Sequence, residues 1–275
     1  MQDDSLLPSL RDTIARHNLS PKKNLGQNFI LDPNVTAKIV RAAGILKGKN
    51  VIEIGPGPGG LTRALLQTDA ACLYAIERDD RCIAALQDII PFSQGRLHLI
   101  AEDALQVDYA SLCPDPRVVV ANLPYNIATT LLLGWLHQIT LFDSLTLMFQ
   151  KEVAERLCAP IRTKDYGRLS VITQWLCNVE HQFDLPPSVF TPPPKVTSSV
   201  VRLTPKPRTD NIAFELMGKL TASAFGQRRK MLRQSLKTMT AEPEVLLARA
   251  DIPPTCRAEE IDVDGFVRMA QALRV

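Results

Sequence analysis

The sequence predicts an α/β fold built on an open, mostly parallel sheet. The first observation is a short β-branched run, Val51–Ile54, that passes through a glycine-rich loop into a helical pattern at Leu61–Leu66. Such a turn suits a nucleotide, because glycine lets the backbone approach a ligand and the helix N-terminus is positive. The second observation is that further apolar runs alternate with helical patterns, and the third is that several runs end in groups suited to binding a ligand.

Length and composition are consistent with one large domain or two unequal ones. The chain has 275 residues, 45% of them hydrophobic, and its formal charge of +3 does not by itself indicate a nucleic-acid ligand. The six cysteines are scattered without C-x-x-C spacing, so we expect no zinc site or disulfide framework, and free thiols in a reducing cytoplasm are the simplest interpretation. No signal-peptide core occurs in residues 1–20, and no apolar run is long enough for a membrane span.

The N-terminal region is expected to hold two helices separated by a basic segment. The first helix is predicted at Pro8–His17. Residues 21–29 form a polar, basic stretch that is equally typical of a solvated linker. The second helix should begin at Pro33, because Asp32 is a suitable N-cap and proline is favoured at the first helical position.

Four strands should bring their carboxyl ends to one edge of the sheet. They are predicted at Asn50–Ile54, Ala71–Ile76, Leu97–Ile100 and Arg117–Ala121, and Gly55, Glu77, Asp103 and Asn122 lie at or just beyond their ends. The spacing of Gly55, Gly57 and Gly60 satisfies G-x-G-x-x-G, which alone is a weak signal. Glu77 comes about 20 residues after this loop, where a carboxylate can accept hydrogen bonds from ribose hydroxyls. An ordinary surface glutamate is the alternative.

The remaining elements complete the sheet and add a helical C-terminal region. Helices are predicted at Asp79–Ile90, Ala128–His137, Lys151–Cys158 and Gly167–Leu176, and strands at Leu145–Phe149, Val179–Leu185 and Val196–Leu203. The last two strands are expected to pair. Between them the stiff, proline-rich loop Pro186–Lys195 would hold Phe190 in a fixed place, either at a site or in the core. After a linker at Pro205–Arg208 the pattern is almost entirely helical.

The stretch Gly226–Lys237 carries basic residues and no acidic one. Arg229, Arg233 and Lys237 recur every four residues, so a continuous helix would place them on one face. A solvated surface is the alternative. Beside a nucleotide-type site, however, a contact with an RNA backbone is the better interpretation.

The motif Asn122-Leu-Pro-Tyr125 is typical of methyl transfer to the exocyclic amine of a base. The lone pair of this amine is delocalised into the ring, so the amine is a poor nucleophile, and two acceptors aimed at its hydrogens favour attack. The Asn122 side-chain oxygen and the Leu123 carbonyl would be these acceptors, and Tyr125 offers a face for stacking the extruded base. Catalysis would then be mainly positioning, with S-adenosylmethionine as methyl donor.

These motifs resemble those of the ribosomal RNA adenine N6-dimethyltransferase family, most closely its bacterial small-subunit members. The resemblance runs from about Leu19 to the C-terminus and rests on Lys23–Phe29, Glu53–Thr62, Asn122–Tyr125, Tyr166–Ser170 and Phe190–Ser198. It implies a class I S-adenosylmethionine-dependent methyltransferase fold, which is Rossmann-like with a seven-stranded sheet, and a small C-terminal helical domain. The implied segments are an N-terminal extension at 1–20, a catalytic domain at 21–205 and an rRNA-binding domain at 209–275.

The resemblance also implies roles for individual residues. The cofactor would be held by Asn28, Ile30, Gly55, Glu77, Asp103 and Asn122. The target adenine would lie between Tyr125 and Phe190, with Asn122 and Leu123 as its acceptors. The RNA would be bound by Lys22, Lys23, Arg228, Arg229, Lys230 and Arg233. Ile30 departs from the leucine usual in the family, which matters little if the contact there is made by backbone.

The implied activity is the transfer of two methyl groups to each of two adjacent adenosines, in the loop of the hairpin near the 3′ end of 16S rRNA. The partner would be the immature 30S subunit, late in its biogenesis in the cytoplasm, and the protein would be a monomer without metal or membrane contact.

Three alternatives remain open. An NAD-dependent oxidoreductase would use the glycine spacing and Glu77 but not Asn122–Tyr125 or Phe190. A non-catalytic ribosome-assembly or transcription factor is disfavoured by the intact motif at Asn122–Tyr125. A resistance-type methyltransferase acting on large-subunit rRNA would share fold, cofactor and motif.

Overall fold

The structure, a computed structural model, describes residues 7–22 and 25–274. Its contacts divide the chain into two compact units. The first runs up to Lys151 and includes Glu180–Thr204, and the second comprises Glu152–Val179 and the chain from Pro205 onward. The units therefore group residues 152–179 with the C-terminal helices, whereas the expected division into functional domains, 21–205 and 209–275, stays a prediction.

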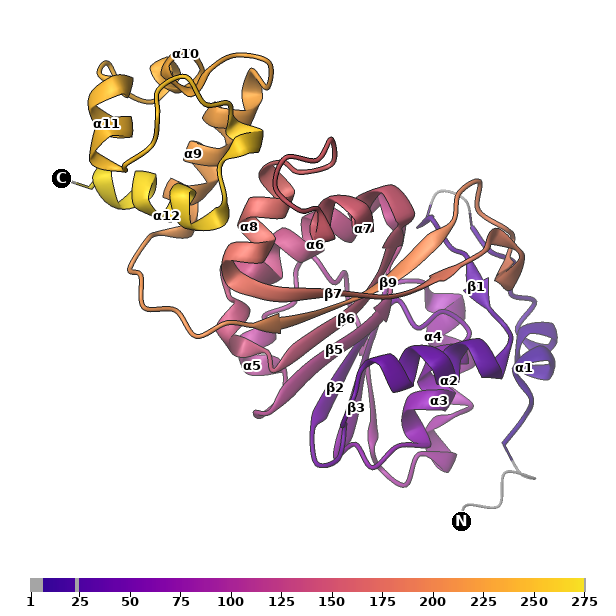
Figure 1. Cartoon of the computed structure of the whole chain (residues 1–275). Helices are drawn as coiled ribbons and strands as arrows, with labels where there is room; N and C mark the ends of the chain where they lie inside the picture. Colours follow the sequence, from indigo (N-terminus) through magenta and orange to yellow (C-terminus); the bar gives the residue numbers. More distant parts are fainter. Residues whose placement is uncertain (1–6, 23–24, 275) are drawn as a thin grey trace. The chain divides into compact units, whose positions relative to one another are not determined.

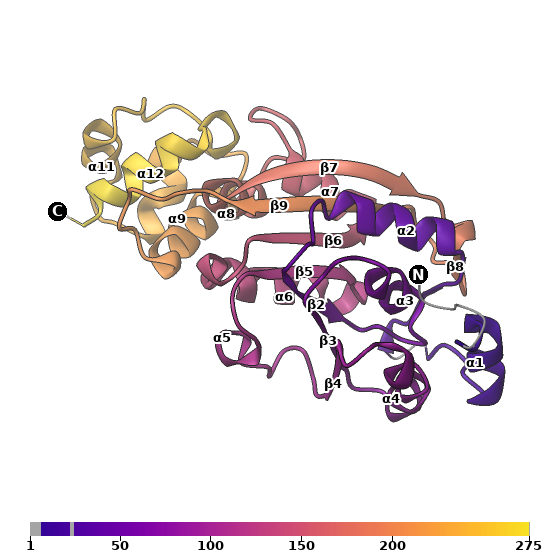
Figure 2. The ribbon, with the colours of Figure 1, turned by 90° about the horizontal axis from the view of Figure 1, so that it is seen from below.

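The first unit is built on a seven-stranded sheet, as the sequence predicts (Figure 1). Its strands are β2 (Asn50–Ile54), β3 (Cys72–Glu77), β4 (Leu97–Ala101), β5 (Arg117–Asn122), β6 (Ser144–Gln150), β7 (Cys177–Leu185) and β9 (Ser198–Pro205). They follow the order β4-β3-β2-β5-β6-β9-β7, which can be seen in Figure 2. β2 to β6 pair in parallel with one another, and β9 is antiparallel to β6. The strand order reverses between β2 and β5, and a ligand crevice forms at the carboxyl ends of strands at such a point.

Helices flank this sheet and bury its apolar residues. In the first unit they are α1 (Leu10–Arg16), α2 (Pro33–Ala42), α3 (Gly60–Leu66), α4 (Asp80–Gln87), α5 (Tyr109–Leu112) and α6 (Tyr125–His137), with 3-10 turns η2 (Ile90–Phe92), η3 (Ile139–Leu141) and η4 (Pro187–Val189). The predicted start of α2 is confirmed, since the Asp32 side chain accepts from the backbone N–H of Asn34 at 2.8 Å. α2 and α3 pack against each other, and α4 packs against β3 and β4. β5 is buried along nearly its whole length, which explains its continuous apolar sequence.

A two-stranded sheet connects the N-terminal segment with the proline-rich loop. β1 (Phe29–Ile30) pairs antiparallel with β8 (Phe190–Thr191), and Ile30 lies opposite Phe190. Strands of two residues have no readable periodicity, so the sequence indicated only a basic segment and a stiff loop at these positions. The pairing ties together two segments that are far apart in the chain.

The second unit is mainly helical. It contains α7 (Lys151–Cys158), α8 (Arg168–Leu176), α9 (Phe214–Gly226), α10 (Leu232–Ser235), α11 (Pro243–Arg249) and α12 (Val263–Ala272), with 3-10 turns η5 (Leu236–Thr238) and η6 (Ala258–Glu260). Its interior includes the stacked rings of Phe225 and Phe266, with Tyr166 edge-on to Phe225.

The continuous basic helix expected at Gly226–Lys237 is wrong. α9 ends at Gly226, and α10 begins only at Leu232. Between them Met231 is extended and forms a β-bridge with Arg257. Pairing with a distant segment therefore outweighs the local helical spacing, and the basic residues of this stretch do not share one helix face.

Among the residues that the structure describes, no helix is long and apolar enough to cross a membrane. Within the same residues, no group of His, Cys, Asp and Glu side chains could hold a metal ion. The six cysteines form no disulfide.

Candidate functional site

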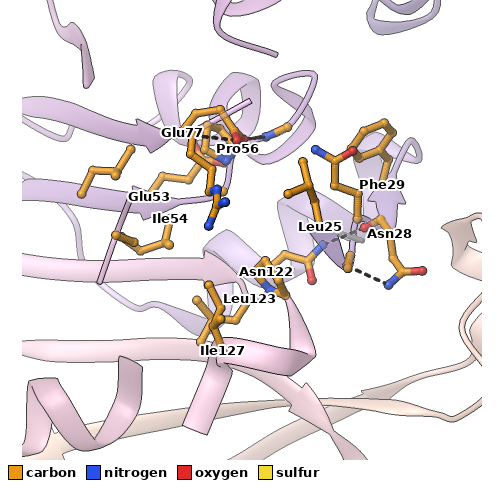
Figure 3. Close-up of a pocket in the computed structure, with 18 of the residues that line it drawn as sticks. Leu25, Asn28, Phe29, Glu53, Ile54, Pro56, Glu77, Asn122, Leu123 and Ile127 are labelled. Carbon is orange, nitrogen blue, oxygen red and sulfur yellow. Dashed lines mark hydrogen bonds between the residues drawn. The ribbon is translucent and has the colours of Figure 1, made fainter. Parts of the chain in front are cut away.

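A cavity of about 140 Å³ lies at the carboxyl ends of the parallel strands of the first unit. Figure 3 shows it between the ends of β2 and β3 and the N-terminal segment Leu25–Ile30, with the end of β5 beside them. It brings together the predicted site residues Asn28, Ile30, Gly55, Glu77, Asp103, Asn122, Leu123 and Tyr125. Groups from four strand ends therefore meet at one edge, as the alternation of strands and helices predicted.

The glycine loop allows backbone segments to come close together at this edge. Gly55 and Gly57 have φ angles of +63° and +56°, which residues with a Cβ rarely adopt. At Gly60, the first residue of α3, a Cβ would lie 2.6 Å from the carbonyl oxygen of Ile30. Gly60 thus makes room for the N-terminal segment, a requirement that the motif alone did not indicate.

Glu77 ends β3 and is held by backbone amides. Its Oε2 accepts from the amide of Gly57 at 3.1 Å, and its Oε1 accepts from the amides of Arg78 and Asp79 at 2.9 Å each. Burial raises the pKa of Glu77, while these three donors oppose the rise. A carboxylate oxygen can accept more than one hydrogen bond, so Glu77 keeps the capacity to bind vicinal hydroxyls.

Asp103 lies just beyond β4 and forms an ion pair at the rim of the cavity. Its Oδ2 accepts from Arg78 Nη1 at 2.8 Å, and its Oδ1 accepts from the backbone amide of Leu105 at 3.0 Å. Arg78 was not among the predicted site residues, and only its position next to Glu77 could have suggested it. These two bonds fix the orientation of the Asp103 carboxylate beside the cavity.

Glu53 is a cavity residue that the sequence analysis missed. It lies in β2 and is only 1% exposed, yet it lines the cavity (Figure 3). Among the described residues neither of its carboxyl oxygens has a hydrogen-bond partner. Burial raises the pKa of Glu53 to about 8. The sequence did contain an indication of this, because Glu53 interrupts an apolar, β-branched run that is typical of a buried strand. A carboxyl group is rarely buried in such a strand unless it has a specific role.

Asn122, the last residue of β5, is oriented by the N-terminal segment. Its Nδ2 donates to the Asn28 carbonyl at 3.1 Å, as Figure 3 shows. This bond fixes the orientation of the amide, whose acceptor atom is Oδ1. Leu123 is buried, and α6 begins at Tyr125, three residues earlier than predicted. Strand end, proline turn and helix start thus position the whole motif.

Tyr125 and Phe190, predicted to hold a base between them, are placed differently. Tyr125 lines the cavity, and its phenol oxygen lies 2.6 Å from Ser198 Oγ. Phe190 is 3% exposed and packs in the apolar core with Ile30. The role of Phe190 at a base stays a prediction, and it requires that its ring become accessible.

The predicted RNA-binding residues fall into two groups. Three have partners within the protein: Lys22 Nζ lies 3.8 Å from Asp79, Arg228 Nε 2.7 Å from Glu259 and Arg233 Nη1 3.7 Å from Glu244. Arg228 also donates to the carbonyls of Thr163 and Lys164. Arg229 and Lys230 are exposed, and Lys23 lies outside the described residues.

The donor set of the cavity fits S-adenosylmethionine. Glu77 suits the ribose hydroxyls, and Asp103 suits the adenine amino group. Asn122, at the end of β5, adds an amide oxygen.

Comparisons with known proteins agree with this chemistry. A family model described as ribosomal RNA adenine dimethylase matches residues 18–274. Ribosomal RNA small subunit methyltransferase A of Paramagnetospirillum magneticum is 57% identical over 270 residues, which cover 97% of this chain and 95% of that protein.

Two solved structures are also similar. The dimethyladenosine transferase from Plasmodium falciparum has a TM-score of 0.74 at 28% identity, covering 86% of this chain and 94% of that one. The 23S rRNA methyltransferase ErmE has a TM-score of 0.69 at 25% identity, covering 90% of this chain and 100% of that one. The fold is that of class I S-adenosylmethionine-dependent methyltransferases, and the chain belongs to the ribosomal RNA adenine dimethylase family.

Proposed function

We propose that the protein dimethylates N6 of two adjacent adenosines in the loop of the hairpin near the 3′ end of 16S rRNA, using S-adenosylmethionine. The observation that carries this proposal is the fixed orientation of Asn122, which lines the cavity and whose Nδ2 donates to the Asn28 carbonyl. The similarity to a small-subunit methyltransferase at 57% identity supports the small subunit over the large one, since the similarity to ErmE is only 25%.

The residues of the chain act mainly by positioning. When bound, S-adenosylmethionine supplies a methyl group activated by a sulfonium centre. Glu77 would accept from the ribose hydroxyls, and Asp103 from the adenine amino group of the cofactor. Asn122 Oδ1 and the Leu123 carbonyl would accept the two N–H groups of the target amine, which directs its lone pair toward the methyl group. No strong base is required, because the methylated amine is acidic and loses its proton after transfer.

We further propose that the substrate is the immature 30S subunit, that the protein acts on it as a monomer, and that it does so in the cytoplasm, where ribosomes are assembled. A hairpin loop suits this chemistry, since its unstacked bases can be extruded at little free-energy cost. The exposed Arg229 and Lys230 support a contact with the RNA backbone.

Mass spectrometry of 16S and 23S rRNA, from cells with and without the gene, tests the substrate. Loss of dimethyladenosine from the 16S hairpin alone is the expected result. Its loss from 23S rRNA instead would assign the protein to the large subunit, and unchanged methylation of both would leave a non-catalytic factor. Tight binding of NADH with weak binding of S-adenosylmethionine to the purified protein would favour the oxidoreductase.

The Asn122→Ala variant tests the mechanism. It should lose methyl transfer almost completely while binding S-adenosylmethionine within a few-fold of the wild type, because the other expected cofactor contacts come from the N-terminal segment, the glycine loop, the end of β3 and the residues after β4. Isothermal titration calorimetry measures the binding, and transfer of labelled methyl groups to 30S subunits measures the activity. Turnover close to that of the wild type would refute the role given to Asn122.

A further inference from the structure

We propose that Ser198 is a positioning residue that fixes the ring of Tyr125 in place before the target base arrives. This inference rests on the proposed function, because it takes Tyr125 to be the residue on which the extruded adenine stacks. The phenol oxygen of Tyr125 and Ser198 Oγ are 2.6 Å apart, although the residues are 73 positions apart in the chain. A short hydrogen bond thus connects the cavity wall to a strand that contributes nothing else to the cavity.

Ser198 is anchored by the large sheet. It is the first residue of β9, is 0% exposed, and lies opposite Gln150 in the antiparallel ladder with β6. Its hydroxyl is therefore held by a rigid, fully buried backbone. At the other end of the bond, Tyr125 is the first residue of α6 and follows Pro124, whose ring restricts the turn. The hydrogen bond of the Tyr125 phenol thus connects the start of α6 with the start of β9.

The ring of Tyr125 is only half-buried, and it faces the cavity. A half-buried ring that is free to move loses conformational entropy when a base stacks on it, which weakens binding. The hydrogen bond to Ser198 restricts the ring before the base binds, so this cost is not part of binding. Burial raises the pKa of the phenol, and the hydrogen bond to Ser198 opposes the rise. The phenol consequently stays neutral and able to donate at physiological pH.

Ser198 is the last residue of a segment, 190–198, that includes part of the stiff, proline-rich loop. The segment begins with β8, which pairs with β1 beside the cavity, and ends at the residue that holds Tyr125. One rigid segment thus connects the N-terminal wall of the cavity with the ring on which the base would stack.

The test compares the single variants Ser198→Ala, Ser198→Thr, Tyr125→Phe, Tyr125→Leu and Ser199→Ala with the double variant of Ser198→Ala and Tyr125→Phe. Ser199 is the matched control: it is the next residue of β9, is also 0% exposed, and its Oγ donates to Asp184 Oδ1 at 2.6 Å, away from Tyr125. Kinetics of methyl transfer to 30S subunits give KM and kcat, and calorimetry gives the affinity for S-adenosylmethionine. A 2-aminopurine at the target position reports base extrusion by fluorescence, independently of turnover.

We expect Ser198→Ala and Tyr125→Phe each to weaken RNA-dependent steps by about 2- to 10-fold, the range for loss of one hydrogen bond. The double variant should be no worse than either single variant, since both remove the same bond. Ser198→Thr, which keeps the hydroxyl, should recover most of the loss. Cofactor affinity should not change, and Ser199→Ala should leave both the kinetics and the 2-aminopurine signal as in the wild type.

The inference fails if Ser198→Ala and Ser199→Ala have the same effect on RNA-dependent kinetics, or if the effects of Ser198→Ala and Tyr125→Phe add. Tyr125→Phe probes the same bond with the ring retained, so it decides the question even if Ser198→Ala does not fold. A wild-type protein that methylates no adenosine in 30S subunits would instead overturn the proposed function. If wild-type activity is normal and Tyr125→Leu alone is impaired, stacking on Tyr125 stands and only the role of Ser198 is lost.

Discussion

Replacing Glu53 by glutamine should change how the stability of the protein depends on pH. Glu53 is 1% exposed, and among the described residues neither of its oxygens has a hydrogen-bond partner. Burial raises its pKa to about 8, whereas a glutamate in the unfolded chain has a pKa of about 4.3. Between these values the folded protein keeps a proton that the unfolded chain releases.

The sign of the effect follows from this difference in bound protons. Below about pH 4.3 the carboxyl is neutral in both states. As the pH rises toward 8, the free energy of unfolding falls, because the unfolded chain is increasingly favoured by ionisation, and above pH 8 the full loss persists. Each pKa unit corresponds to about 1.4 kcal/mol, so the loss is on the order of a few kcal/mol. Glutamine carries no charge at any pH, so the Glu53→Gln variant does not undergo this loss of stability.

Denaturant unfolding of the wild type and Glu53→Gln at pH 5, 6.5 and 8 measures this effect. The variant should gain stability relative to the wild type as the pH rises. Contributions of other groups, including Glu77, are present in both proteins and largely cancel. Glu102→Gln, at an exposed position of the same cavity, is the control and should show no such trend. A difference between Glu53→Gln and the wild type that stays constant from pH 5 to 8 would refute the reasoning.

Two further predictions concern a glycine of the loop and the basic residues of the second unit. Gly59→Ala should destabilise the protein by about 1–3 kcal/mol, because φ there is +90° and a Cβ would lie 2.6 Å from a neighbouring side-chain carbon. Gly95→Ala is the control, because φ there is also positive but nothing lies within 4 Å of the added Cβ, so this variant measures backbone strain alone. If chemical unfolding shows the same loss of stability in both variants, the steric clash at Gly59 does not contribute. Arg228→Ala should lower the free energy of unfolding, since it removes the ion pair with Glu259. Arg229→Ala should leave that free energy unchanged, because Arg229 is exposed, and should weaken RNA binding and make the RNA affinity less dependent on salt. Thermal unfolding and 30S binding at several salt concentrations measure the two effects. Normal stability with weakened 30S binding in Arg228→Ala would show that Arg228 is the RNA contact.

Local patterns were sufficient where the role of a residue depends on its own strand or turn. The strand at Asn50–Ile54 and the helix at Lys151–Cys158 have the predicted bounds, because β-branched runs and amphipathic spacing are short-range signals. Glu77 and Asn122 lie at the same edge, because the carboxyl ends of parallel strands must meet there.

Contacts between distant segments could not be read in this way. The pairing of β1 with β8, the break at Gly226 and the bond between Tyr125 and Ser198 each depend on a partner many residues away. Arg228 shows the same limit, since its basic character suggested RNA, while its position places it against Glu259.

The amino-acid pattern alone specified the parallel sheet, the glycine loop and the acceptor groups at the strand ends, since periodicity and turn chemistry act over a few residues. Tertiary structure decided which atoms of those groups remain available. It tied Asn122 Nδ2 to Asn28, left Glu53 buried without a partner among the described residues, and placed Phe190 in the core. The physical reason is that a hydrogen bond or a buried position is shared by two segments, and only the folded chain brings both of them together.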